Sequence, residues 1–186
     1  MAWLLLVLGI ALWYAAHLFK RVAPDRRAAL GARGQGPIAL ALLLSVLLMV
    51  LGYRWAEIVP LYAPWPGMGH LNNLAMLVAA WLFFGGSVGS WLASRYRHPM
   101  LTAAIVWAVA HLLVNGDLAS VLLFGSLGIW AALEIAVINR AEDWAPARVP
   151  FGRRDAVLIV VSLIAYAIIT AVHVWLGHNP FLGSYG

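Results

Sequence analysis

The chain has 186 residues, of which 64% are hydrophobic and only 10% are charged, with a mean hydropathy of +0.89. An average soluble domain carries about 25% charged residues, so 7 acidic and 12 basic residues cannot cover the surface of a soluble globule. The net charge of +5 comes from short basic clusters between apolar runs, which argues against nucleic-acid binding. Because the chain lacks cysteine, any metal must be held by histidine or carboxylate.

The apolar runs predict an all-α polytopic integral membrane protein, a bundle of about six transmembrane helices forming one domain over residues 1–186. Pro99 suits the first turn of the fourth helix. Asp117 suits the N-cap of the fifth, and a functional role is the equal alternative. In the third, Gly85 and Gly89 form a small-xxx-small pattern that predicts close helix packing. The expected spans are roughly residues 2–19, 37–59, 71–93, 99–115, 118–138 and 156–177.

Apart from Arg54, basic residues are confined to the connections that follow the first, third and fifth spans. The other two connections contain no Lys or Arg, so the positive-inside rule predicts cytoplasmic odd-numbered connections and both termini on the periplasmic side. The positive charge follows the first apolar run, and we therefore expect that run to remain as a helix and not to act as a cleaved signal. The basic residues of these three connections are Lys20, Arg21, Arg26, Arg27, Arg33, Arg95, Arg97, Arg140, Arg148, Arg153 and Arg154.

Histidines within the spans are the first candidates for a functional site, because polar residues in a membrane are costly. His111 is surrounded by apolar residues about one turn before its span ends. Helix rise places His70 and His173 in the same leaflet as His111, and His17 towards the cytoplasmic side. We predict His111, His17 and His70 as metal ligands and His173 as a further cofactor contact. Hydrogen bonding to a neighbouring helix or to water is the alternative for each ring.

Three charged side chains lie inside predicted spans. Arg54 stands three residues before Glu57, so the two can pair on one helix face. Alternatively, Arg54 anchors an anionic group such as a haem propionate, which a planar guanidinium matches well. Glu134 is either a proton-relay carboxylate or a residue that extends to the membrane interface, and we expect the second.

A longer motif gives a specific resemblance. Arg97-His98-Pro99, followed by Trp107-Ala-Val-Ala-His-Leu-Leu-Val-Asn-Gly-Asp117, resembles the core signature of the NnrU family. Ala16-His17-Leu18 and Arg26-Arg27-Ala28-Ala29-Leu30 look like the opening segment of that family. The likeness covers nearly the whole chain, and it implies a bacterial inner-membrane protein linked to nitrite and nitric oxide respiration.

The NnrU family is in turn similar to ζ-carotene isomerase, a membrane enzyme that uses haem b. That similarity implies haem b here, with ligands at His17 and His111. The isomerase has a cysteine three residues before the second histidine, where this chain has Ala108, which puts isomerase activity in doubt. Helix rise separates His17 from His111 by roughly 15 Å along the membrane normal, so His70 or His173 is the better partner of His111 by depth. We predict His111 first and keep His17 and His70 as its rival partners.

Two functions follow as hypotheses. The first is a haem b protein in the lipid bilayer that supports redox chemistry or polyene isomerisation on a hydrophobic small-molecule substrate; the sequence assigns no catalytic residue. The second is a non-enzymatic accessory or assembly protein for a respiratory reductase, acting through its helix faces. We expect no nucleic-acid partner, and a homo-oligomer is a further expected assembly.

Overall fold

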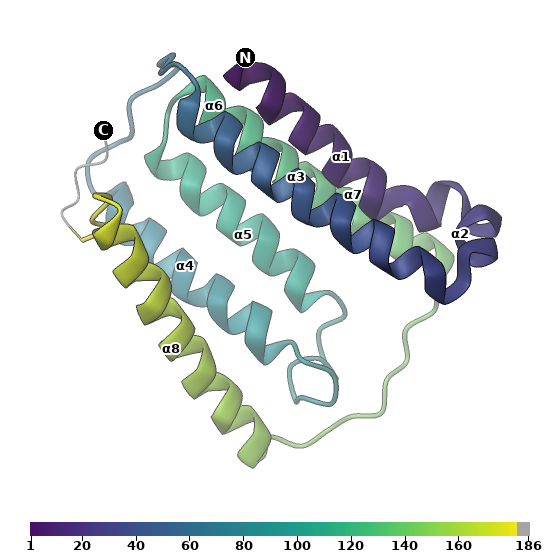
Figure 1. Ribbon diagram of the computed structural model, residues 1–186. Coiled ribbons are helices and arrows are strands. Elements are labelled where there is room, and N and C mark those ends of the chain that lie inside the picture. The colour runs from purple at the N-terminus through teal and green to yellow at the C-terminus, as the bar shows by residue number, and fades with distance from the viewer. Residues whose placement is uncertain (182–186) are drawn as a thin grey trace. The chain divides into compact units, whose positions relative to one another are not determined.

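The computed structural model describes residues 1–181, and its regular structure is helical (Figure 1). Leu118–Ala141 is one continuous helical stretch that includes a π-helical turn, η2. This arrangement confirms the all-α prediction. The elements are α1 (Ala2–Val22), α2 (Pro24–Leu30), η1 (Gly31–Gly34), α3 (Gln35–Trp55), α4 (Met68–Gly85), α5 (Pro99–Val114), α6 (Leu118–Ser120), η2 (Val121–Gly125), α7 (Ser126–Ala141) and α8 (Arg153–Trp175).

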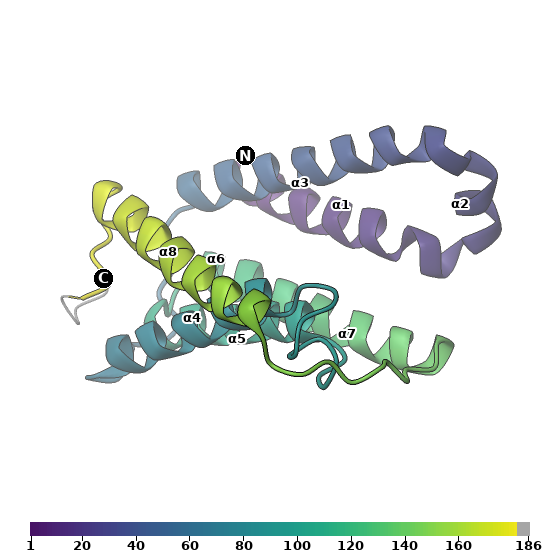
Figure 2. The same cartoon turned by 90° about the horizontal axis from the view of Figure 1, so that it is seen from below.

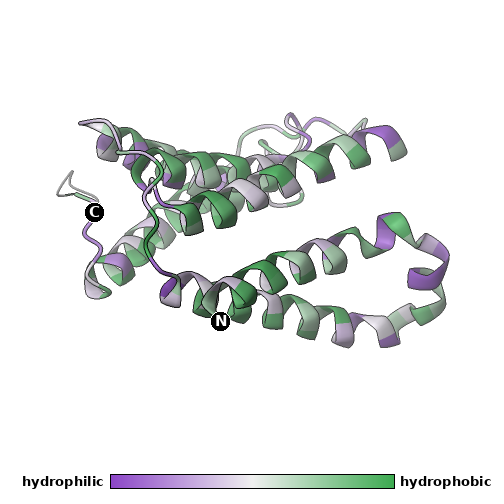
Figure 3. Cartoon of the chain, turned by 90° about the horizontal axis from the view of Figure 1, so that it is seen from above, coloured by the Kyte–Doolittle hydropathy of each residue, from purple (hydrophilic) through white to green (hydrophobic). Residues whose placement is uncertain are grey.

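Long apolar helices dominate the chain. Within residues 1–181, five helices are long and apolar enough to cross a membrane. The sixth, α5, has 16 residues, or about 24 Å at the rise of an α-helix. Figure 3 shows the helices coloured mostly as hydrophobic, with polar colour gathered at connections such as α2. Many large apolar side chains are exposed, which suits lipid as the solvent. The protein is therefore a polytopic membrane protein.

The chain forms two compact units, and the first comprises Met1–Leu61 with Asp117–Ser126. In it, α1 and α3 run side by side in opposite directions and are joined through α2 (Figures 1 and 2). Two glycines allow this approach: a Cβ on Gly9 would lie 2.7 Å from the amide nitrogen of Met49, and one on Gly52 would overlap the backbone of Leu6. Small residues at such positions bring helix backbones together.

The first basic connection contains more regular structure than the loop expected from sequence. Pro24 occupies the first turn of α2, where its missing N–H costs nothing, and Asp25 stands in the same turn. The short helix ends at Gly31, whose φ of +48° suits glycine.

The second unit comprises Tyr62–Gly116 and the chain from Leu127 onward. Here α4 packs against both α5 and α8. A Cβ on Gly128 would lie 3.2 Å from that of Ala108, so α7 also approaches α5 closely. The prediction of a single transmembrane domain over 1–186 stays a prediction, and residues 182–186 lie outside the described part of the chain.

The third predicted span was wrong at its end, because α4 stops at Gly85 and not near residue 93. The Ser87 and Ser90 hydroxyls donate to the carbonyls of Phe84 and Gly85, each at 2.7 Å, and so take over acceptors that a continuing helix would use. Gly89 then turns the chain with a φ of +78°. Gly85 and Gly89 therefore do not share a helix face.

Candidate functional site

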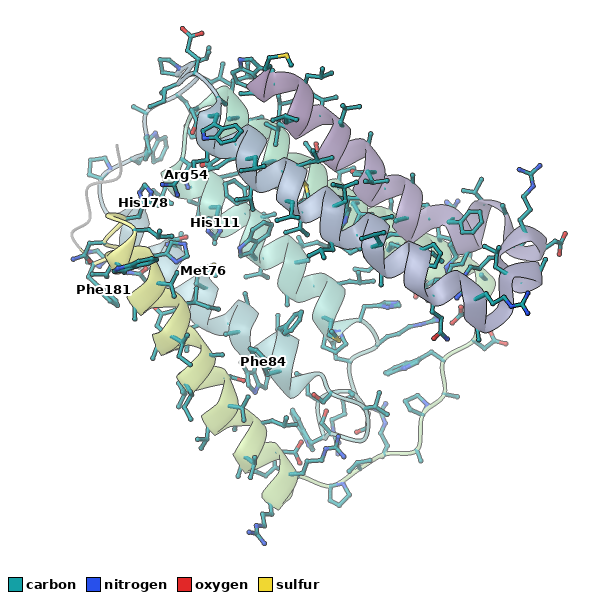
Figure 4. All side chains as sticks on the ribbon, in the orientation of Figure 1. Arg54, Met76, Phe84, His111, His178 and Phe181 are labelled. Carbon is teal, nitrogen blue, oxygen red and sulfur yellow. The ribbon has the colours of Figure 1, made fainter. Side chains whose placement is uncertain are left out.

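His111 lies on α5, one turn before the helix ends (Figure 4). Its Nδ1 is 2.8 Å from the carbonyl oxygen of Trp107. A carbonyl only accepts hydrogen bonds, so Nδ1 carries the proton and donates, and in the neutral ring the lone pair is on Nε2. The Trp107 ring lies beside the imidazole, with centroids 5.1 Å apart. The helix thus fixes both the tautomer and the surroundings of the ring.

Two other helical histidines are held in the same way. Nδ1 of His17 is 3.0 Å from the carbonyl of Trp13, and Nδ1 of His173 is 2.8 Å from that of Ile169. The Trp13 ring stacks on His17 at 4.1 Å between centroids. In all three rings Nε2 is the nitrogen able to ligate a metal.

The tryptophans beside His17 and His111 are residues that the sequence analysis missed. The signal was present as a spacing, because Trp13 precedes His17 by four residues just as Trp107 precedes His111. On a helix that spacing places each indole over the imidazole one turn later.

The other predicted site residues fall in different surroundings. His173, near the end of α8, is close enough to interact electrostatically with His111. His70, the third residue of α4, has an exposed side chain that makes no hydrogen bond within residues 1–181. Arg54 is exposed in the last turn of α3, and Glu57 lies beyond the helix end. Arg54 and Glu57 therefore do not share a helix face, and the predicted pairing along one helix was wrong.

Glu134 is buried on α7, with 5% of its surface exposed. A carboxylate that extends to the interface would be exposed, so the expected snorkelling was wrong. The position of Glu134 along its helix predicts its depth in the membrane, but it does not predict which side of the helix the neighbouring helices cover.

The Asn115-Gly116 pair closes the end of α5 next to His111. Asn115 donates from its side chain to the His111 carbonyl at 2.9 Å. The Tyr62 hydroxyl donates to the carbonyls of Leu112 and Asn115. A Cβ on Gly116 would overlap the Tyr62 carbonyl, so glycine is needed there. These two residues of the motif have a structural role.

Asp117 caps the next helix, as predicted. Its Oδ1 accepts from the Ser120 amide at 3.0 Å, and its Oδ2 accepts from the Ser120 hydroxyl at 2.5 Å. The Tyr53 hydroxyl lies 2.9 Å from the same Ser120 oxygen. Since that serine proton is used on Asp117, Tyr53 must donate. Asp117 thereby fixes the start of the helix and the link to α3.

A bare metal ion has no ready site. Within the part of the chain that the structure describes, no three His, Cys, Asp or Glu side chains gather to hold one. His17, His111 and His173 stand on separate helices, each with its Nδ1 committed to the backbone. Such an arrangement suits a cofactor that brings most of its own ligands.

Fold and site together define a polytopic α-helical membrane protein in which His17, His111 and His173 bond through Nδ1 to carbonyls of their own helices. The family model described as NnrU protein matches residues 5–180, nearly the whole chain, and the chain belongs to the NnrU family. No curated protein and no solved structure matches it.

Proposed function

We propose that this protein binds haem b and that His111 is an axial ligand of the iron. The observation that carries the proposal is the bond from Nδ1 of His111 to the Trp107 carbonyl, because it puts the lone pair of the neutral ring on Nε2, the nitrogen that would bind the iron. Haem-ligating and metal-ligating histidines typically donate their other ring N–H to a backbone carbonyl or carboxylate, which fixes the orientation and basicity of the ring.

The donor set fits a haem better than a bare ion. A structural zinc needs about four protein ligands and a catalytic zinc about three, whereas a porphyrin iron needs only one or two from the protein. His111 is half-buried among apolar neighbours, including the buried Ala108 and Ala110. Ala108 is packed closely against α7, and such apolar neighbours exclude water from the side of the helix next to the ring.

The second axial position goes to one of three rivals. His17 and His173 share the tautomer of His111, and the family resemblance favours His17. His70 stays in the set because its exposed ring is available at the start of α4. Arg54 is proposed to bind a propionate, since its guanidinium is exposed at a helix end.

A bound haem would supply one-electron redox chemistry or promote isomerisation of a polyene. The protein would hold the ring, keep it dry and admit a hydrophobic substrate from the bilayer. We assign the site to a bacterial inner membrane with both termini periplasmic, and to nitrite and nitric oxide respiration, on the basis of the basic connections and the family resemblance.

An absorption spectrum of the detergent-purified protein, oxidised and then reduced with dithionite, tests the proposal. We expect a Soret band and pyridine haemochrome near one haem per chain, lost in His111→Ala. His178→Ala is the matched control, because His178 is exposed and lies beyond α8 (Figure 4). The same measurement on His17→Ala, His70→Ala and His173→Ala assigns the second ligand. A His111→Ala protein with full haem content contradicts the proposal and favours the accessory role.

A further inference from the structure

The first turn of α8 presents two exposed arginines, Arg153 and Arg154. Neither guanidinium makes a hydrogen bond within residues 1–181. The guanidinium of Arg154 passes over Gly89, where a Cβ would lie only 3.4 Å from its Nη1. Because Gly89 has no side chain, nothing from this position covers the charge.

Nearby arginines are committed differently. Arg95 donates to the Val149 carbonyl at 2.6 Å, and Arg148 donates to the Ser94 carbonyl at 2.9 Å. Arg97 donates to backbone carbonyls at the end of α7. These three side chains connect the two loops at this end of the unit. Their roles are structural, and the charge available to a ligand is that of the arginines on α8.

Asp155 fixes the position of the surface through backbone amides, and its carboxylate interacts electrostatically with Arg154. Its carboxylate is buried and accepts from the amides of Trp91 at 2.7 Å and Gly152 at 2.9 Å. The loop held in this way places the Trp91 ring edge-on to Phe151, with 6.3 Å between centroids. The Arg95 guanidinium lies over the same indole at 4.9 Å.

We propose that Trp91, Phe151, Arg153 and Arg154, here called the α8 basic surface, bind the headgroup of an anionic phospholipid of the surrounding bilayer. Guanidinium groups match phosphate oxygens in charge and geometry. The surface lies at the start of a helix long and apolar enough to span the membrane. It is therefore at the depth of lipid headgroups.

The aromatic pair favours a lipid over a soluble phosphate. Trp is enriched at membrane interfaces, where its ring contacts the glycerol and upper acyl region and its N–H remains hydrated. Phe151 is 58% exposed although it is fully apolar, which suits a residue covered by lipid. A soluble anion would use the arginines and leave this apolar ring in water.

The test uses the full chain in neutral detergent micelles doped with phosphatidylglycerol or phosphatidylcholine, with retained lipids counted by native mass spectrometry. We expect phosphatidylglycerol to be preferred. Arg153→Gln with Arg154→Gln should weaken its binding about fivefold for each arginine removed, or about 25-fold for both. Arg153→Lys with Arg154→Lys keeps the charge and should retain most of the preference.

Arg26→Gln with Arg33→Gln is the matched control, because it removes two exposed charges from the other unit. Three results would overturn the proposal. They are equal retention of the two lipids by the unmodified protein, an equal loss of binding in the control, and displacement of phosphatidylglycerol by glycerol phosphate at the same concentration. None of them depends on whether haem binds.

Discussion

Gly116→Ala tests whether the end of the His111 helix depends on contact with the Tyr62 segment. The new Cβ would lie 2.9 Å from the carbonyl carbon of Tyr62 and 3.0 Å from its Cδ2, and closer still to the carbonyl oxygen. Tyr62 must move, which strains its backbone bond to Gly116 and its hydroxyl bonds to Leu112 and Asn115. Overpacking costs about 1–3 kcal/mol and a net hydrogen bond about 1 kcal/mol. We expect unfolding free energy to fall by about 2–4 kcal/mol.

A double-mutant cycle shows whether the mechanism is right. Tyr62→Phe alone should cost about 1 kcal/mol, but almost nothing in the Gly116→Ala background, where the hydroxyl has already left its acceptors. Unfolding is followed by circular dichroism during titration with a denaturing detergent. Gly36→Ala is the control, because a Cβ there meets nothing within 4 Å. Equal costs for Tyr62→Phe in both backgrounds would refute the reasoning.

Three further predictions use the same unfolding assay or hydrogen exchange. Gly52→Ala should destabilise the α1–α3 pair by about 1–3 kcal/mol, because its Cβ would meet helix backbone; a cost within the error of Gly36→Ala would contradict this. Asp117→Ala should cost about 1 kcal/mol as a lost N-cap and Asp117→Asn much less, and equal costs would mean that the bonds to Ser120 are not stabilising. Asp155→Ala should speed hydrogen exchange at the Trp91 amide, which loses its acceptor; an unchanged rate would show that the loop is held by other contacts.

The spanning helices were predictable because apolar run length is a direct requirement of the bilayer. The end of α4 was not predictable in this way, since Trp91, Leu92 and Ala93 continue the apolar run after the helix has stopped. Leu92 folds back into a core with Leu82 and Ala103. Hydropathy cannot distinguish a lipid-facing residue from one buried in a loop. The sequence Gly85-Gly86-Ser87 was the better signal for the end of α4.

The candidate site was only partly predictable. Helix rise gives the depth of a residue, and it placed His111 and His173 in one leaflet, where the structure brings them within electrostatic range. Rise says nothing about which side of a helix faces a neighbour. That is why Glu134 was expected at the interface and lies buried, and why the exposure of His70 was not foreseen.

The motif that carries the family resemblance has two physical roles. The side chains of Asn115 and Asp117 satisfy backbone groups that a membrane would otherwise leave unpaired, and Gly116 leaves room for the Tyr62 backbone between them. The bond between Trp107 and His111 serves no such need, because the Trp107 carbonyl lies inside α5, where it already accepts from a backbone N–H of the next turn. This bond fixes the tautomer of the His111 ring instead, and the same arrangement recurs between Trp13 and His17. We therefore expect the proposed haem ligation at the Trp-x-x-x-His spacing, whereas the Asn-Gly-Asp turn closes the helix that carries His111.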